Sequence, residues 1–180
     1  MILTVTMGDF LLSILSSILA SLIFLITVFF LLRPRLHIAP NIAKFEELYF
    51  FKVCNRSLFR AYDIKIELFE VRNIQMSGNH LQLENINIKK SVSSPPSLAK
   101  FDIASRVKKP QNHIRYEFAL QFKTDANIDE ILNNSQKFLR VQIEARHGLT
   151  GLQSIFVEDF DNSSVIKSGN FVSGKFFEIK

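Results

Sequence analysis

Few residues in this chain have the types and spacing that proteins use for catalysis. The segment GNFVSGK, from Gly169 to Lys175, has the G-x-x-x-x-G-K spacing of a phosphate-binding loop, in which backbone N–H groups surround phosphates. Such a loop continues with Ser or Thr and then a helix. Here Phe176 follows, in a context typical of a strand. The pattern therefore does not predict a nucleoside triphosphate site.

The histidines and the single cysteine also give no pattern of a metal or catalytic centre. The histidines are far apart in the sequence and have no cysteine or acid pair at ligand spacing: His37, His80, His113 and His147. Cys54 has no histidine close in sequence, so a buried structural thiol is favoured over a nucleophile. Neither a Ser-His-Asp pattern nor a pair of catalytic carboxylates can be read from spacing. We therefore expect a protein that is not an enzyme and uses no metal or cofactor.

His147, in the segment ARHGLTG, stands out among the histidines because it precedes a turn. A turn near the surface exposes its side chains to water. We expect His147 to be a solvent-exposed turn residue.

The basic residues offer a different kind of chemistry, which is the binding of anions. The chain has 22 Lys and Arg against 17 Asp and Glu, for a net charge of +5. This small and scattered excess suits a domain near anionic lipid or an anionic ligand, and it does not predict binding to a nucleic-acid polymer. Four loop lysines could bind an anionic small ligand such as a nucleotide messenger, or could simply be solvated: Lys89, Lys90, Lys108 and Lys109.

Residues 10–32, FLLSILSSILASLIFLITVFFLL, contain no charged residue. A helix needs roughly 20 apolar residues to cross a bilayer, so this segment is predicted to be a transmembrane helix. A signal peptide is the alternative. It is disfavoured by the lack of a basic n-region, by the length of the apolar run and by the lack of an A-x-A-like cleavage site.

The flanking charges predict how this helix is oriented. Residues 1–9 hold only Asp9, whereas Arg33 and Arg35 follow the helix directly. Positive residues stay on the cytoplasmic side, so residues 1–9 should be extracytoplasmic and the residues after the helix cytosolic. The helix itself should lie in the cell (inner) membrane. The single cysteine fits a reducing compartment. Arg33, Arg35 and Lys44 could hold lipid headgroups, or could form an ordinary stop-transfer cluster.

Three serines in the helix are spaced by four, at Ser13, Ser17 and Ser21, and so share one face. Small residues at this interval let helices approach closely, which predicts a helix–helix interface. The alternative is that each hydroxyl bonds back to the preceding turn. Both interpretations stay open.

Beyond residue 46 the dominant pattern has a period of two, which is typical of strands with one buried face. It is clearest in residues 62–69, 114–123 and 139–146. Further strands are expected at 48–54, 81–88, 152–158 and 171–179. Residues 33–46, with Pro34 and Pro40, are expected to form a stiff juxtamembrane linker.

One helix is expected among these strands. In TDANIDEILNNS, residues 124–135, the apolar residues Ile128, Ile131 and Leu132 have helical spacing, with Asp125 as the N-cap. Residues 89–112 are expected to form a mobile loop region. The chain is therefore predicted to be mainly β, with residues 47–180 forming an immunoglobulin-like β-sandwich after a single transmembrane helix.

The order of these segments resembles the cytoplasmic domain of inwardly rectifying potassium channels. In FFKVCNRSLFRAYDIKIEL, residues 50–68, Val53, Cys54 and Asn55 stand where that family has V-G-N, and an alternating strand follows. HLQLENINI, NIDEILNN and FLRVQIEARHGLTGLQSIFVEDF then resemble the family's next strand, short helix and strand pair. SSVIKSGNF keeps Gly169 and Phe171 of the family's E-I-x-W-G-x-x-F, with Lys167 in place of Trp. The resemblance covers most of residues 48–178.

The resemblance implies a regulatory sandwich that assembles around a four-fold axis and answers to a ligand or lipid near the membrane. It also implies that Asp63 faces the axial pathway, although an ordinary surface acid on an exposed strand face is the favoured interpretation of Asp63. The chain has no second membrane helix, pore helix or T-x-G-Y-G-like filter, so it cannot itself be such a channel.

Three functions are compatible with these observations. The first is a homo-oligomeric sensor or effector, with a tetramer favoured, whose sandwich acts on its helices and on membrane permeability or ion conduction. The second is a membrane-anchored protein-interaction module without transport activity. The third is a receptor for an anionic small ligand, either a lipid headgroup or a nucleotide messenger.

Overall fold

The structure, a computed structural model, describes residues 7–31, 35–57, 59–75, 81–90, 97–100, 118–172 and 177–180. The chain divides into two units, Met1–Arg33 and Pro34–Lys180. In the first unit, helix α1 runs from Met7 to Leu31. An 18-residue window within Met7–Phe29 has a mean hydropathy of 2.5, so α1 is long and apolar enough to cross a membrane. It is compatible with a single-pass anchor or with a signal sequence.

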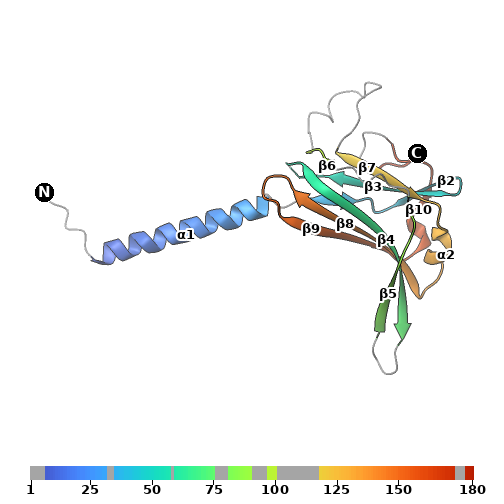
Figure 1. The fold of residues 1–180 in the computed structure, drawn as a ribbon, viewed down its shortest axis with the longest axis horizontal. Coiled ribbons are helices and arrows are strands. Elements are labelled where there is room, and N and C mark those ends of the chain that lie inside the picture. The colour runs from blue at the N-terminus through green and yellow to red at the C-terminus, as the bar shows by residue number, and fades with distance from the viewer. Residues whose placement is uncertain are drawn as a thin grey trace, which may run out of the picture. The chain divides into compact units, whose positions relative to one another are not determined.

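The second unit is a β-sandwich of two sheets, as the alternating pattern predicted (Figure 1). In the first sheet, β3 (Leu48–Asn55) is central and pairs along one edge with β7 (Ala119–Thr124). Its other edge pairs with β1 (Leu36–Ile38) near Asn55 and with β2 (Ile42–Phe45) near Leu48. The short strand β10 (Ile166–Ser168) adds to β2 in parallel.

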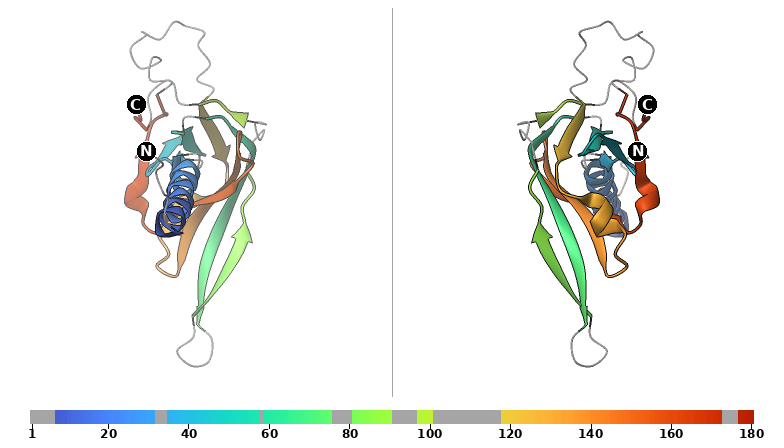
Figure 2. Two further views of the ribbon diagram at one scale, coloured as in Figure 1. Left: turned by 90° about the vertical axis from the view of Figure 1, so that its left-hand side faces the viewer. Right: turned by 90° about the vertical axis from the view of Figure 1, so that its right-hand side faces the viewer.

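The second sheet has the order β5-β4-β8-β9, and all of these pairs are antiparallel. Its strands are β5 (Leu81–Asn87), β4 (Ala61–Gln75), β8 (Lys137–His147) and β9 (Gln153–Phe160), with β6 (Ser97–Leu98) pairing the start of β4. Pairing of β4 with β8 ends at Arg72, whereas pairing with β5 continues to Gln75. The end of β4 and β5 therefore form a ribbon that projects from the sheet (Figure 2).

The core forms between the two sheets from the apolar residues of each alternating pattern. Phe51 of β3 stacks on Phe122 of β7, with ring centroids 5.0 Å apart, and meets Phe160 of β9 edge-on at 6.3 Å. From β8, Leu139, Val141 and Ile143 are fully buried, while the residues between them reach the outer face. Burial of this apolar surface is the dominant stabilising term, and the described residues that form it run from Leu36 to Phe160.

Three details differ from the sequence-based expectations. Residues 36–38 and 42–45, expected in the linker, form β1 and β2, because Leu36, Ile38 and Ile42 are buried in the core. The strand expected at 171–179 is a single Phe171–Ile179 bridge in the described residues. Helix α2 (Ile128–Leu132) is capped by Asn127 and not by Asp125: the Asn127 side chain accepts a hydrogen bond from the Glu130 N–H.

Candidate functional site

The described part of the sandwich contains a cavity of about 420 Å³ that we call the lysine pocket. Three of its six lining residues are lysines, and one is an acid. The lining residues are Leu48, Lys89, Lys90, Lys123, Thr124 and Asp125. Three lysines that border one cavity favour the approach of an anion, and the apolar residue Leu48 offers contact to a less polar group.

The two halves of the lysine pocket come from different sheets. Lys123 and Thr124 end β7, opposite Phe50 and Tyr49 of β3. Because side chains alternate along a strand, the Thr124 side chain points inward and Lys123 points to solvent. Lys89 and Lys90 follow β5 in the other sheet. The pocket therefore lies where the edges of the two sheets meet.

Three hydrogen bonds fix the backbone at this junction. The buried Thr124 hydroxyl donates to the Lys89 carbonyl at 2.6 Å, and its oxygen accepts from the Ala126 N–H at 3.1 Å. The preceding residue, Ile88, is buried and donates its N–H to the Leu68 carbonyl at 2.8 Å. The backbone that carries Lys89 and Lys90 is thus fixed to both sheets.

Electrostatics distinguish Lys90 from a freely solvated lysine. Partial burial lowers the pKa of Lys90, and the Lys65 charge lowers it further, while Glu67 opposes the shift. A bound anion would offset the cost of keeping Lys90 charged, because an opposite charge favours the ammonium form. Lys90 therefore gains more from an anionic ligand than a fully solvated lysine would.

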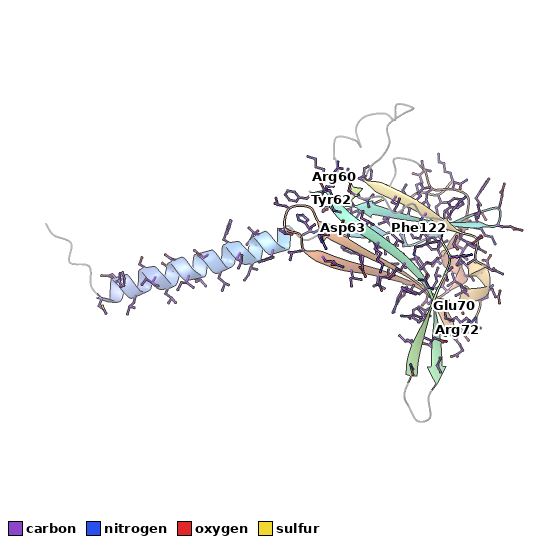
Figure 3. The ribbon with its side chains drawn as sticks, in the orientation of Figure 1. Arg60, Tyr62, Asp63, Glu70, Arg72 and Phe122 are labelled. Atoms are coloured by element: carbon purple, nitrogen blue, oxygen red, sulfur yellow. The ribbon has the colours of Figure 1, made fainter. Side chains whose placement is uncertain are left out.

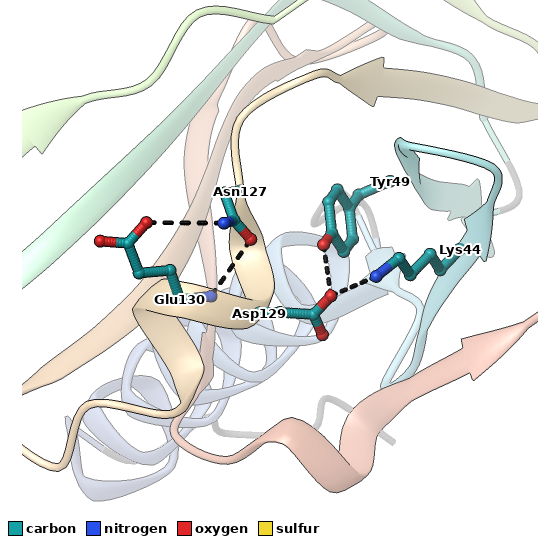
Figure 4. Close-up of polar contacts among 5 residues, drawn as sticks. All are labelled: Lys44, Tyr49, Asn127, Asp129 and Glu130. Atoms are coloured by element: carbon teal, nitrogen blue, oxygen red, sulfur yellow. Dashed lines mark hydrogen bonds and ion pairs between the residues drawn. The ribbon is translucent and has the colours of Figure 1, made fainter.

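A second cavity of about 310 Å³ adjoins the lysine pocket, and the two share Asp125. Here Asp129 of α2 accepts hydrogen bonds from Lys44 Nζ and from the Tyr49 hydroxyl (Figure 4). Hydrogen bonds from Lys44 and then Tyr49 lower the pKa of the Asp129 carboxyl. No group of residues with metal-ligand geometry occurs in the described part of the chain. The cluster serves to fasten α2 to the first sheet.

The other residues singled out in the sequence lie apart from the lysine pocket. Lys44 is bonded to Asp129, while Arg35 lies beside the opposite end of β3, so the structure does not bring these two together. Asp63 sits in a β-bulge of β4 with φ of 49°, and pairs with Arg146 at 3.1 Å. Ser13, Ser17 and Ser21 all lie within α1. Arg33, Lys108 and Lys109 lie outside the described residues.

His147 is buried, so the expectation of an exposed turn histidine was wrong. Its Nδ1 accepts from the Leu149 and Thr150 N–H groups, both at 3.3 Å, and its ring meets Phe59 edge-on at 5.1 Å. Burial lowers the pKa of His147. Its Nε2 has no hydrogen-bond partner in the described part of the chain. His147 shapes the β8–β9 turn and does not face the lysine pocket.

Cys54 is a buried thiol, as predicted, and burial raises its pKa to about 11. Next to it, the fully buried Asn55 holds two loops together. Its amide donates to the carbonyls of Phe59 (3.0 Å), Leu98 (3.3 Å) and Ala99 (2.9 Å). Its oxygen accepts from the Ser57 N–H at 2.9 Å. Both residues are structural.

Sequence reasoning identified Lys89 and Lys90 as candidate anion ligands but missed Leu48, Lys123 and Thr124. Lys123 carried a weak signal, as an outward residue of an alternating strand next to the helix start. Such positions are ordinarily solvated lysines, and only the pairing of the strands shows which of them border a cavity. Thr124 carried no signal.

No protein-family model and no curated protein matches the chain, so no family is identified. The structure supports an N-terminal apolar helix followed by two β-sheets that form a β-sandwich.

Proposed function

We propose that the chain is a membrane-anchored receptor whose β-sandwich binds a small anionic ligand in the lysine pocket. The observation that carries this proposal is the convergence of Lys89, Lys90 and Lys123 on one cavity of about 420 Å³. The volume falls within the range of small-molecule sites, and an anionic group with an attached less polar part fits its lining. The chemical class is a soluble phosphate ester.

Thermal-shift measurements with pyrophosphate, nucleotides and inositol phosphates test this proposal. A ligand that binds only the folded state raises the melting temperature. The double variant Lys89→Ala, Lys123→Ala should lose the shift. Lys167→Ala should keep it, because Lys167 is an exposed lysine of β10 and does not line the pocket. If none of the anions raises the melting temperature, or if Lys167→Ala abolishes the shift as fully as the double variant, the proposal fails.

The anchor in this proposal is α1, with residues 1–9 outside the cytoplasm and the sandwich inside the cell. The support is the hydropathy of Met7–Phe29 together with Arg33 and Arg35 directly after the helix. A signal sequence would instead be removed. The mass of the mature protein and protection from added protease in sealed cells separate these outcomes, because a retained, inward-facing sandwich stays intact.

We further propose that ligand binding acts on assembled helices, as a homo-oligomeric sensor would, with a tetramer favoured. Ser13, Ser17 and Ser21 support this, because the continuous helix α1 aligns residues four apart on one face. Changing all three to Leu should reduce the mass of the complex in mild detergent. An unchanged mass and unchanged membrane conductance would contradict the effector role.

The alternative of an anchored protein-interaction module has one specific observation in its favour. Ile155 and Val157 lie on the outer face of β9, an edge strand, and are 57% and 47% exposed. Apolar side chains at a sheet edge suit a protein partner. In this alternative, α1 can be exchanged for an unrelated anchor without loss of function, and Ile155→Lys should release the partner.

A further inference from the structure

The end of the sandwich at which the chain enters, at Arg35, is held together by backbone hydrogen bonds. The Arg56 N–H donates to the Arg35 carbonyl at 2.8 Å, where β1 and β3 meet. The Gly148 N–H donates to the Arg60 carbonyl at 3.0 Å, which joins the start of β4 to the β8–β9 turn. Figure 3 shows Arg60, Tyr62 and Asp63 beside this turn. The Asn55 amide links these two contacts by donating to the Phe59 carbonyl at 3.0 Å, so residues next to β1, β3, β4 and β8 lie at this end of the sandwich.

Apolar side chains project from the same surface. The β8–β9 turn exposes 66% of Leu149 and 38% of Leu152. The turn is well fixed, since the His147 N–H donates to the Leu152 carbonyl at 2.8 Å and the Gly151 N–H donates to the His147 carbonyl at 2.9 Å. Gly148 lies so close to the Tyr62 ring that a Cβ would clash with it at 2.6 Å. Leu149 and Leu152 are therefore kept exposed by a turn that is closely packed against β4.

Most of the charged residues that we place on this surface are arginines, and Asp63 is the acid among them. Arg35, Arg56 and Arg60 are exposed, and Arg146 is paired with Asp63 at 3.1 Å. The other end of the eight-residue strand β3 lies about 23 Å away at the rise of a strand, and it mixes lysines with Glu46, Glu47 and the acids of α2. We call the arginine-rich surface the entry face. Its members are Arg35, Arg56, Arg60, Arg146, Leu149 and Leu152.

We infer that the entry face rests on an anionic lipid surface, with the arginines on phosphate groups and the two leucines among the headgroups. Interfacial segments that combine Arg with exposed apolar residues bind anionic membranes in this way. The inference rests on the proposed membrane anchor. Only residues 32–34 separate α1 from Arg35, and four residue steps of extended chain reach at most about 14 Å. A bilayer that holds Leu31 is therefore within reach of Arg35.

A cysteine-attached fluorophore in the full-length protein tests this inference. Cys54 is buried and its pKa is raised to about 11, so a thiol reagent labels an introduced cysteine instead. Leu149→Cys places the probe on the entry face. Ser163→Cys is the matched control, because Ser163 is exposed and follows β9 at the far end of that strand. Both proteins are reconstituted into phosphatidylcholine vesicles with and without phosphatidylserine.

The probe at residue 149 should shift to shorter wavelength and be quenched by lipid-borne quenchers in the phosphatidylserine vesicles, and added salt should reverse the change. Arg56→Gln with Arg60→Gln should weaken it, while Lys167→Gln should not. Equal spectra at residues 149 and 163 would overturn the inference. A salt-insensitive blue shift that grows with protein density would also overturn it, in favour of a second copy of the chain.

Alkaline extraction separates this inference from the anchor on which it rests. If the protein is extracted from the vesicles, α1 is not inserted and the proposed anchor fails. If the protein stays in the membrane while the probe at residue 149 remains exposed to water, only the role of the entry face fails.

Discussion

The Thr124 hydroxyl donates a hydrogen bond of 2.6 Å to the Lys89 carbonyl, and this bond joins the end of β7 in one sheet to the segment after β5 in the other. The lysines on either side of this contact, Lys89 and Lys123, line the same cavity. The geometry of the lysine pocket therefore depends on a junction between two sheets. A ligand that binds both lysines should stabilise that junction.

The first prediction concerns Thr124. Thr124→Val keeps the shape of the side chain but removes the donor, so the partly buried hydrogen bond to the Lys89 carbonyl is lost. We expect a loss of about 1–3 kcal/mol in the free energy of unfolding, measured by urea denaturation of residues 34–180. Thr124→Ser keeps the hydroxyl and is the matched control. A loss in Thr124→Ser without a loss in Thr124→Val would show that the methyl group, and not the hydrogen bond, holds the junction.

The second prediction concerns Asn55, which donates to the carbonyls of two loops and accepts from Ser57. Asn55→Leu leaves several buried polar groups without a partner. The free energy of unfolding should fall by about 3 kcal/mol or more, since each unsatisfied group costs about 1–3 kcal/mol. Asn85→Leu, at an exposed position of β5, should change it by less than about 0.5 kcal/mol. A stable Asn55→Leu variant would contradict the structural role given to this residue.

The third prediction is a pH dependence of ligand binding. Burial lowers the pKa of Lys90, so this lysine loses its proton at a lower pH than a solvated lysine does. Anion affinity should therefore fall as the pH rises through this lowered pKa, because the ligand needs the ammonium form. Binding should also take up protons, which calorimetry in buffers of different ionisation enthalpy detects. Lys90→Gln should remove both effects, and a pH profile unchanged by that substitution would exclude Lys90 from the site.

The fourth prediction concerns acid stability. Hydrogen bonds from Lys44 and Tyr49 lower the folded-state pKa of Asp129 below its usual value of 3.8. The carboxylate therefore stabilises the fold fully above that value, and this contribution is lost as the pH falls through the lowered folded-state pKa. On acidification, the free energy of unfolding should fall less in Asp129→Asn than in the parent chain. The difference should be up to about 1 kcal/mol, because the Lys44–Asp129 ion pair is partly exposed. An equal loss of stability on acidification in Asp129→Asn and the parent chain would contradict the contacts of Asp129 with Lys44 and Tyr49.

The fold was predictable where a single alternating pattern decides burial. Leu139, Val141 and Ile143 alternate with polar residues, and they are buried in β8 as expected. The alternating pattern did not predict β1 and β2, because strands of three and four residues are too short to show a period. Asp125 and Asn127 are both good cap residues, and only the backbone geometry decides that Asn127 caps α2.

Only the part of the lysine pocket that is formed by residues adjacent in the sequence was predictable. Lys89 and Lys90 are adjacent in the sequence and so form a visible basic pair. Lys123 reaches the same cavity through the pairing of β7 with β3 and through the Thr124 bond to Lys89, which are contacts between distant residues. The burial of His147 was likewise not predictable from the local sequence. Its burial depends on the fold of its own turn and on Phe59, and no local pattern encodes this.

The most direct measurement of the central proposal is an NMR titration of isotope-labelled residues 34–180 with pyrophosphate. We expect saturable shifts of the amide signals of Lys89, Lys90, Lys123 and Thr124, and their loss in the Lys89→Ala, Lys123→Ala variant. Shifts confined to Arg56, Arg60 and their neighbours, or shifts that do not saturate, would contradict a ligand site in the lysine pocket.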